Sequence, residues 1–233
     1  MPGRNSRNRQ DSMRTRRTLP NGIAIEQIAT ALEAITTARA SYRLTVRLKG
    51  RDIPAVGEGL IDFGRNIESY RLSVNGKQLE HIDAGADRFH LLPPNRQQDT
   101  GKRWAWEKGC PYGSYWAQVF AAVRDIARCT GSGAEVMAAG ETVHRYSFLI
   151  KPRRKTILHT HLQGHGLDRV NLDIWLAADQ TIRKIRDQKT ALEIALFDGR
   201  TNTVSSTAEY SDFGAAVDLA APPADEVLGS PAE

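Results

Sequence analysis

Three histidines between positions 159 and 165 form the cluster of side chains best suited to metal chemistry. His159 and His161 lie two residues apart, so they would point to the same side of a β-strand, and His165 could fold back beside them across Gly164. Zinc is the metal that such ligands favour. The sequence places no second histidine cluster and no obvious carboxylate beside them. We therefore expect structural or surface histidines without a bound metal, and keep a metal-dependent enzyme as the third hypothesis for function.

The motifs of common nucleophilic and nucleotide-dependent enzymes are absent from the sequence. It contains no Gly-x-Ser-x-Gly elbow, no phosphate-binding loop and no dinucleotide fingerprint. We therefore expect a protein that is not an enzyme and that uses no cofactor.

The net charge of +5 is concentrated at the amino terminus. Residues 1–17 carry six of the 32 basic residues and one of the 27 acidic ones, so the rest of the chain holds 26 of each. The segment has too few apolar residues to fold. We expect a disordered, Arg-rich arm over residues 1–20, either simply solvated or attracted to an anionic membrane surface. The equal numbers of basic and acidic residues in the rest of the chain argue against specific binding of nucleic acid.

The sequence shows no clear export signal. No apolar run is long enough for a signal peptide or a transmembrane helix, and no lipobox cysteine lies near the amino terminus. Cys110 and Cys129 flank an expected helix that would hold them roughly 28 Å apart, so we expect two free thiols, which suits a reducing compartment. The protein then works in the cytoplasm, is exported by another route, or lacks its leader.

Hydrophobic periodicity divides the chain into helix, β-meander, helix, β-meander. Apolar residues at spacings of three and four predict amphipathic helices over about 23–39 and 112–128, and from Tyr42 onward the period changes to two. Asn75-Gly76 predicts a hairpin turn, and residues 93–101 a polar loop. Further strands are expected at about 55–63, 66–75, 77–83, 86–92, 134–138, 142–150, 170–176, 181–186, 190–198 and 203–211.

This order predicts an α+β fold: a curved antiparallel sheet of about ten strands, forming a half-barrel with two helices covering its concave face. We expect one such domain over residues 21–220 and a flexible Pro/Ala-rich tail over 221–233. A plain core and a ligand cavity share the same apolar pattern, so periodicity alone leaves the two open.

Three segments resemble the actinobacterial lipoproteins of the LppX/LprG type, relatives of the LolA-like carriers. They are Glu135–Tyr146, Leu172–Ile185 and the ending Ala208–Val227, which contains Ser211-Asp212-Phe213-Gly214 and Pro222-Pro223-Ala224-Asp225-Glu226-Val227. In this order they cover, with the predicted elements, about residues 23–227. The chain departs from the family pattern in the missing lipid anchor, in Gln180 where the turn usually has Gly, and in the basic segment 151–155.

The resemblance implies a LolA-like half-barrel in the cell envelope that carries a lipid, an acyl chain or a lipoprotein segment in an apolar cavity, without catalysis. The side chains expected to line that cavity are Tyr42, Leu44, Val46, Leu48, Trp116, Phe120, Val123, Leu172, Ile174 and Leu176. The alternative is a sensor or regulatory module that uses the same fold to bind a partner protein, as RseB-like relatives do.

Overall fold

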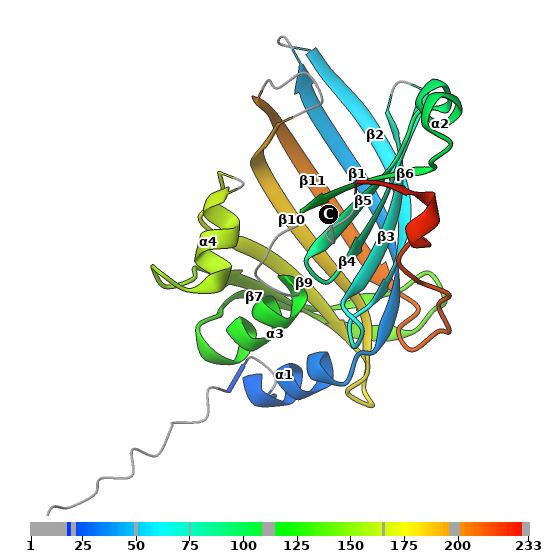
Figure 1. Cartoon of the computed structure of the whole chain (residues 1–233). Coiled ribbons are helices and arrows are strands. Elements are labelled where there is room, and N and C mark those ends of the chain that lie inside the picture. Colours follow the sequence, from blue (N-terminus) through cyan, green and yellow to red (C-terminus); the bar gives the residue numbers. More distant parts are fainter. Residues whose placement is uncertain are drawn as a thin grey trace, which may run out of the picture.

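The computed structural model describes residues 18–19, 22–48, 51–74, 76–108, 115–164, 166–195 and 201–229. Most of the arm expected to be disordered over residues 1–20, the thiol of Cys110 and the position of His165 lie outside these ranges. Within that arm, Thr18 forms a β-bridge with Ala24 and Leu19 is buried. Within them, one sheet of twelve strands has the order β12-β6-β5-β4-β3-β2-β1-β11-β10-β9-β8-β7. The sheet curves around the helices, as Figure 1 shows. The predicted α+β half-barrel is confirmed.

The first half of the sheet follows chain order and is antiparallel. It consists of β1 (Thr37–Leu48), β2 (Arg51–Asp62), β3 (Ile67–Val74), β4 (Lys77–Ala84), β5 (Asp87–Leu91) and β6 (Trp104–Lys108). Val74 pairs with Lys77 around Gly76, whose φ of 73° is the positive value that the tight turn needs, so the predicted hairpin is confirmed.

The second half is also a meander. It consists of β7 (Arg128–Val136), β8 (Thr142–Ile150), β9 (Val170–Leu176), β10 (Ile182–Ala195) and β11 (Thr201–Ser211). Strands β1 and β11 join the two halves, in a register that places Arg39 opposite Ser211. The runs expected separately at 181–186 and 190–198 belong to one strand, β10, with an irregularity between Lys189 and Leu192.

Four α-helices accompany the sheet, two more than the sequence predicts: α1 (Ile25–Glu33), α2 (Pro94–Thr100), α3 (Tyr115–Asp125) and α4 (Ile157–Gly164). Helix α2 forms in the predicted polar loop, with Pro94 at its start and Gly101 in the left-handed conformation at its end. Its seven residues bury no side chain, so no apolar periodicity marks it. Helix α4 replaces the strand geometry expected for His159 and His161.

The apolar faces of α1, α3 and α4 meet inside the curved sheet. Helix α1 buries Ile25, Ile28 and Leu32, and Gln27 accepts a hydrogen bond from the Ala24 amide at 2.9 Å, which caps its start. Together with the buried residues of α3 and α4, these side chains form one core with β8, β9 and β10. The helices lie at one end of the concave face, and β1 and β2 extend beyond them (Figure 1).

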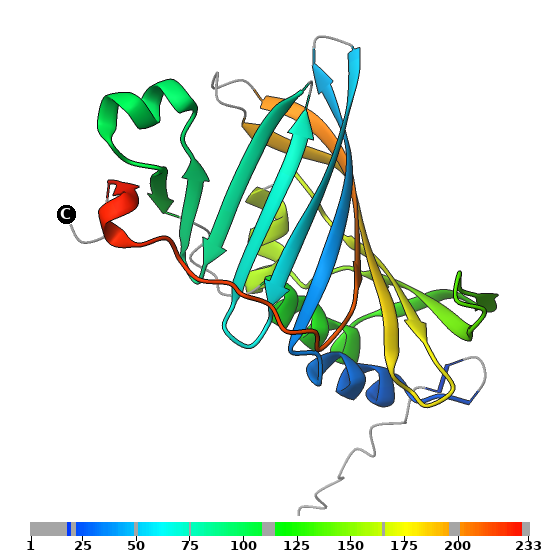
Figure 2. The same cartoon turned by 90° about the vertical axis from the view of Figure 1, so that its right-hand side faces the viewer.

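The chain after β11 runs along the sheet from β1 to β6, on the face opposite the helices (Figure 2). Arg65 donates a hydrogen bond to the Leu219 carbonyl at 2.8 Å, and the Leu219 side chain is buried. The one-turn 3-10 helix Ala224–Glu226 then leads into β12 (Val227–Leu228), which pairs in parallel with β6. The expectation of a flexible tail is therefore wrong for residues 221–229.

Candidate ligand-binding surface

Most of the side chains predicted to line a cavity lie in the packed core. Val123 and Ile174 expose no surface, so no water-sized space adjoins them. Leu172, Trp116 and Phe120 expose 1%, 3% and 6% of their surface and belong to the same cluster. These five residues fill the end of the half-barrel where the helices lie.

Leu176 exposes 2% of its surface and belongs to the same core, and it also lines a separate pocket at the edge of the sheet. Tyr42 and Leu44 of β1 are half-buried, and Tyr42 packs against the edge of the core. The side chains of Val46 and Leu48 lie outside the part of the chain that the structure describes.

Strand β1 shows how the concave face changes along its length. Ala38 and Ala40 are buried in the core, Tyr42 follows at its border, and Leu44 lies beyond the helices. Because alternate residues of a strand share a face, these four side chains form one row on the concave side. The concave face therefore has a packed end, a middle zone at Tyr42 and a far zone at Leu44.

The far zone is mainly apolar on β1 to β4, although Ser206 of β11 lies opposite Leu44 and Lys77 of β4 lies opposite Val74. The register places Leu44 opposite Ala55, Ala55 opposite Val74, and Leu72 opposite Leu79. Opposite residues of paired strands share a face, and none of these side chains belongs to the core that contains the buried residues of α1, α3 and α4. We call this the distal apolar surface, and its half-buried members are Leu44, Ile53, Leu72, Val74 and Leu79.

A row of rings crosses the middle zone. Tyr210 contacts the core residue Trp116 with ring centroids 4.7 Å apart, and Tyr42 follows at 6.4 Å from Tyr210. Tyr70 lies 6.0 Å from Tyr42. The row continues through His81, stacked on Tyr70 at 4.9 Å, to His90 at 4.4 Å from His81.

Gly59 of β2 makes room for this row. A Cβ atom at this position would lie 2.9 Å from Cε2 of Tyr42 and 2.5 Å from the carbonyl oxygen of Ser69. Real Cβ atoms do not approach other atoms so closely, so only glycine lets the Tyr42 ring lie across β2 toward β3.

Charged groups accompany the rings, and most are paired with one another. Tyr42 donates a hydrogen bond of 2.6 Å to Glu68. Arg88 donates two hydrogen bonds to Asp83, at 2.6 and 2.9 Å. We call the whole zone the polar belt. Its members are Tyr42, Glu68, Tyr70, His81, Asp83, Arg88, His90, Glu107, Tyr115, Asp187, Lys189 and Tyr210.

Asp187 of β10 is the buried charged residue of the described chain, with 1% of its surface exposed. Its Oδ2 atom accepts a hydrogen bond from Tyr115 at 3.1 Å and lies 3.1 Å from Nζ of Lys189. Its Oδ1 atom has no hydrogen-bond partner among the described residues. Lys189 also lies 4.2 Å from the centre of the Tyr115 ring. The belt thus contains one buried acceptor that has no partner within the described chain.

Burial disfavours the charged form of several belt groups. It raises the pKa of Glu68, against the opposing effect of the Tyr42 hydrogen bond. Burial, with smaller effects from His90 and Arg88, lowers the pKa of His81 to about 4, so this ring is neutral at pH 7. The pKa values of Tyr42 and Tyr210 are raised, chiefly by burial. Curvature brings distant strands together here, since Lys189 of β10 affects the pKa of Glu68 on β3.

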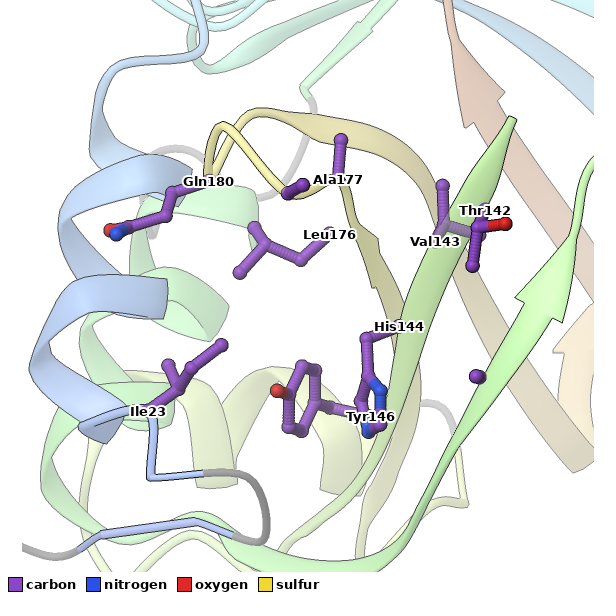
Figure 3. A pocket seen from close by; sticks show the side chains of 10 residues that line it. Ile23, Thr142, Val143, His144, Tyr146, Leu176, Ala177 and Gln180 are labelled. Atoms are coloured by element: carbon purple, nitrogen blue, oxygen red, sulfur yellow. The ribbon is translucent and has the colours of Figure 1, made fainter.

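A second hollow lies at the edge of the sheet, where the β8 and β9 ends meet the start of α1 (Figure 3). It has a volume of about 380 Å³. Its wall is mainly apolar, with Leu176 on one side and the rings of His144 and Tyr146 on another. Gln180, at the turn where the family pattern has Gly, closes one end and adopts a positive φ of 66°.

His159 and His161 belong to helix α4, so the strand spacing considered for them does not apply. Among the described residues, no group of three or more His, Cys, Asp or Glu side chains is placed to hold a metal ion. Cys129 has a free thiol. The described helices include none long and apolar enough to cross a membrane.

Sequence reasoning missed the polar belt, although two signals for it exist. Glu68 and Tyr70 alternate with Ser69 and Arg71, so both faces of the first half of β3 carry polar groups, in contrast to Leu72 and Val74 in its second half. The second signal is the pair of glycines, Gly57 and Gly59, at alternate positions within a strand, which marks a close approach to the strand's face.

No family model matches this chain, and no curated protein matches it. Solved structures that match include the Mycobacterium tuberculosis lipoprotein LppX, at 13% identity and a TM-score of 0.47, covering 84% of this chain and 96% of that chain. An uncharacterized conserved protein from Thermus thermophilus matches at 10% identity and a TM-score of 0.38, covering 87% of this chain and 97% of that chain. A DUF1329 family protein from Desulfovibrio piger matches at 9% identity and a TM-score of 0.35, covering 84% of this chain and 93% of that chain. These likenesses concern the fold and carry nothing about ligand or activity. LppX, which represents the family that the three sequence segments resemble, is thus among the structures that match this chain.

Proposed function

We propose that this protein is a non-enzymatic binding protein that holds the acyl part of a lipid or acylated ligand against the distal apolar surface. One observation carries the proposal: large aliphatic side chains on the concave face remain partly exposed and lie outside the core that the helices form with the sheet. Side chains of a completed core would be covered, as Val123 and Ile174 are. Exposed apolar surface on a concave wall is typical of ligand sites.

The energy available from such a surface is sufficient for binding. Burial of one methylene group contributes about 0.8 kcal/mol. A twelve-carbon chain that is fully covered would therefore gain roughly 9 kcal/mol, from which the cost of immobilising the chain must be subtracted. The remainder corresponds to dissociation constants in the micromolar range or weaker. No covalent chemistry is needed for this function.

The wider biological role is part of the same proposal. A carrier of lipids or lipoproteins in the cell envelope agrees with the family that the sequence segments resemble. The six arginines among residues 1–17 would bring such a carrier to an anionic membrane surface, with an affinity that falls as salt increases.

Native mass spectrometry of the full chain, followed by lipid extraction, tests the proposal. We expect adducts with the mass of acyl lipids that disappear on extraction and return on incubation with lipid. Leu72→Asp puts a charge on the distal apolar surface and should abolish the adducts. Val56→Asp is the matched control, because Val56 lies on the neighbouring strand β2 and is already 59% exposed.

Two results would contradict the proposal. One is a mass without adducts that stays unchanged in excess lipid. The other is equal lipid binding by the wild-type protein and by folded Leu72→Asp. A stoichiometric protein in place of lipid in the first spectrum would favour the partner-binding module instead.

A further inference from the structure

We infer that the polar belt selects the head of the bound amphiphile, accepting an uncharged head with hydroxyl groups and rejecting heads that carry phosphate or carboxylate. The inference rests on the proposed function, because the place of the head follows from the tail lying on the distal apolar surface. The inference specifies the chemical class of the ligand's head group, which the apolar residues alone do not define.

The belt and the distal apolar surface adjoin on the same strands. Tyr42 and Leu44 are two residues apart on β1, as are Tyr70 and Leu72 on β3 and Leu79 and His81 on β4. Two residues of a strand span about 7 Å. A molecule whose tail covers the leucines therefore brings its first polar atoms against the rings.

The positively charged side chains of the belt are already paired with carboxylates. Arg88 makes two hydrogen bonds to Asp83 and lies 3.8 Å from Glu107. Nζ of Lys189 lies 3.1 Å from Asp187. With Glu68 and Glu107 the belt contains more carboxyl groups than cations. An anionic head would lose its hydration here and would meet carboxylates without gaining a free cation.

The belt atoms that lack a hydrogen-bond partner are suited to hydroxyl groups of a ligand. Besides Oδ1 of Asp187, the Nδ1 atoms of His81 and His90 are buried without hydrogen-bond partners among the described residues. A neutral imidazole nitrogen either donates or accepts, and a hydroxyl group can satisfy both states. The stacked rings of Tyr70 and His81 add a flat apolar wall of the kind that a sugar face covers.

A cationic head fits less well. It would lose its hydration in this zone, and burial, the main cause that lowers the pKa of His81 to about 4, shows that a positive charge is disfavoured there. The belt therefore favours a head that has hydrogen-bonding groups and no net charge.

Three amphiphiles with the same twelve-carbon tail test the inference: dodecyl glucoside, dodecyl phosphate and dodecyltrimethylammonium. Their dissociation constants for the full chain would be measured by titration calorimetry below the micelle-forming concentrations. We expect dodecyl glucoside to bind at least about tenfold more tightly than either charged amphiphile.

The outcomes separate the two proposals. If none of the three binds, the proposed function fails. If all bind equally, the tail alone is recognised, so the function stands and the inference is wrong. Tighter binding of dodecyl phosphate would also overturn the inference and would indicate Arg51 and Lys77, exposed at the far strand ends, as the contacts of the head. Tighter binding of dodecyltrimethylammonium would overturn it in favour of the carboxyl groups.

Two variants test the role of the belt. Asp187→Asn leaves Lys189 without its carboxylate, so dodecyl phosphate should gain affinity and the preference for the glucoside should shrink at least about tenfold. Glu107→Gln is the second variant, because the Glu107 side chain is 52% exposed and its replacement should leave the fold intact. It removes a carboxylate beside Arg88 and His90, and the preference should shrink in the same direction. A preference that stays unchanged in both folded variants would contradict the inference.

Discussion

Replacing Gly59 with alanine should destabilise the half-barrel, although it adds only one methyl group. The new Cβ would lie 2.5 Å from the Ser69 carbonyl oxygen and 2.9 Å from the Tyr42 ring. The tyrosine ring could turn away, but the carbonyl oxygen belongs to the backbone of β3. To reach an ordinary carbon–oxygen contact of about 3.3 Å, β2 and β3 must separate by roughly 0.8 Å.

The magnitude follows from the cost of overpacking. Inserting a methyl group into a site without space typically costs about 1–3 kcal/mol. For a chain of this size, each kcal/mol lowers the melting temperature by about 2–4 °C. We therefore expect Gly59→Ala to reduce the free energy of unfolding by about 2 kcal/mol and the melting temperature by about 4–8 °C.

Thermal and urea unfolding of matched variants provide the assay. Gly133→Ala on β7 is the control, because a Cβ at that position meets no atom within 4 Å and Gly133 has no positive φ. It should be neutral or stabilise by up to about 1 kcal/mol. If Gly59→Ala proves as stable as Gly133→Ala, β2 and β3 are not packed as closely as the structure shows, and the account of how Tyr42 reaches Glu68 is wrong.

Three further predictions concern the core, pH and the carboxyl-terminal segment. Ile174→Ala should lower the free energy of unfolding by about 2–5 kcal/mol and leave the affinity for dodecyl glucoside within about twofold, because Ile174 lies in the packed core; a large loss of affinity would place it in the ligand site instead. The unfolded His81 ring gains its proton near pH 6.5 but the folded one only near pH 4, so the free energy of unfolding should fall as pH drops through this window, by at most about 3 kcal/mol. His81→Asn should remove that part of the pH dependence in urea titrations, and an unchanged slope would show that the ring is not buried in its neutral form. Leu219→Ala should cost about 2 kcal/mol in thermal unfolding, since its side chain is buried against the sheet; no measurable cost would mean that the carboxyl-terminal segment is dispensable.

The strands were predictable because local patterns define them. The alternation that begins at Tyr42 and the Asn75-Gly76 turn depend on neighbouring residues alone, and β1, β3 and β4 form where these patterns lie. The helix expected at 112–128 corresponds to α3, which is shorter because β7 already begins at Arg128. Helices α2 and α4 are short and lack a long apolar period, so no comparable pattern predicts them.

The candidate site was only partly predictable, because its properties arise between distant segments. Whether Leu172 fills a core or lines a cavity depends on how far α3 reaches into the half-barrel, which no local pattern shows. The contact of Tyr42 with Glu68 crosses β2 and requires glycine at position 59. The pairing of Lys189 with Asp187 matters for ligand charge only because curvature brings β10 near β3.

The seam between β1 and β11 also has a consequence for how the protein folds. Each meander consists of hairpins between neighbours in sequence, which form quickly, whereas Arg39 and Ser211 must meet across most of the chain. Closing this loop costs entropy before any contact compensates it. During synthesis, the first meander can therefore form while its concave face is still open to other molecules, including a chaperone. Because the belt needs Tyr42 from one side of the seam and Lys189 from the other, we expect it to be completed only after the two meanders have joined.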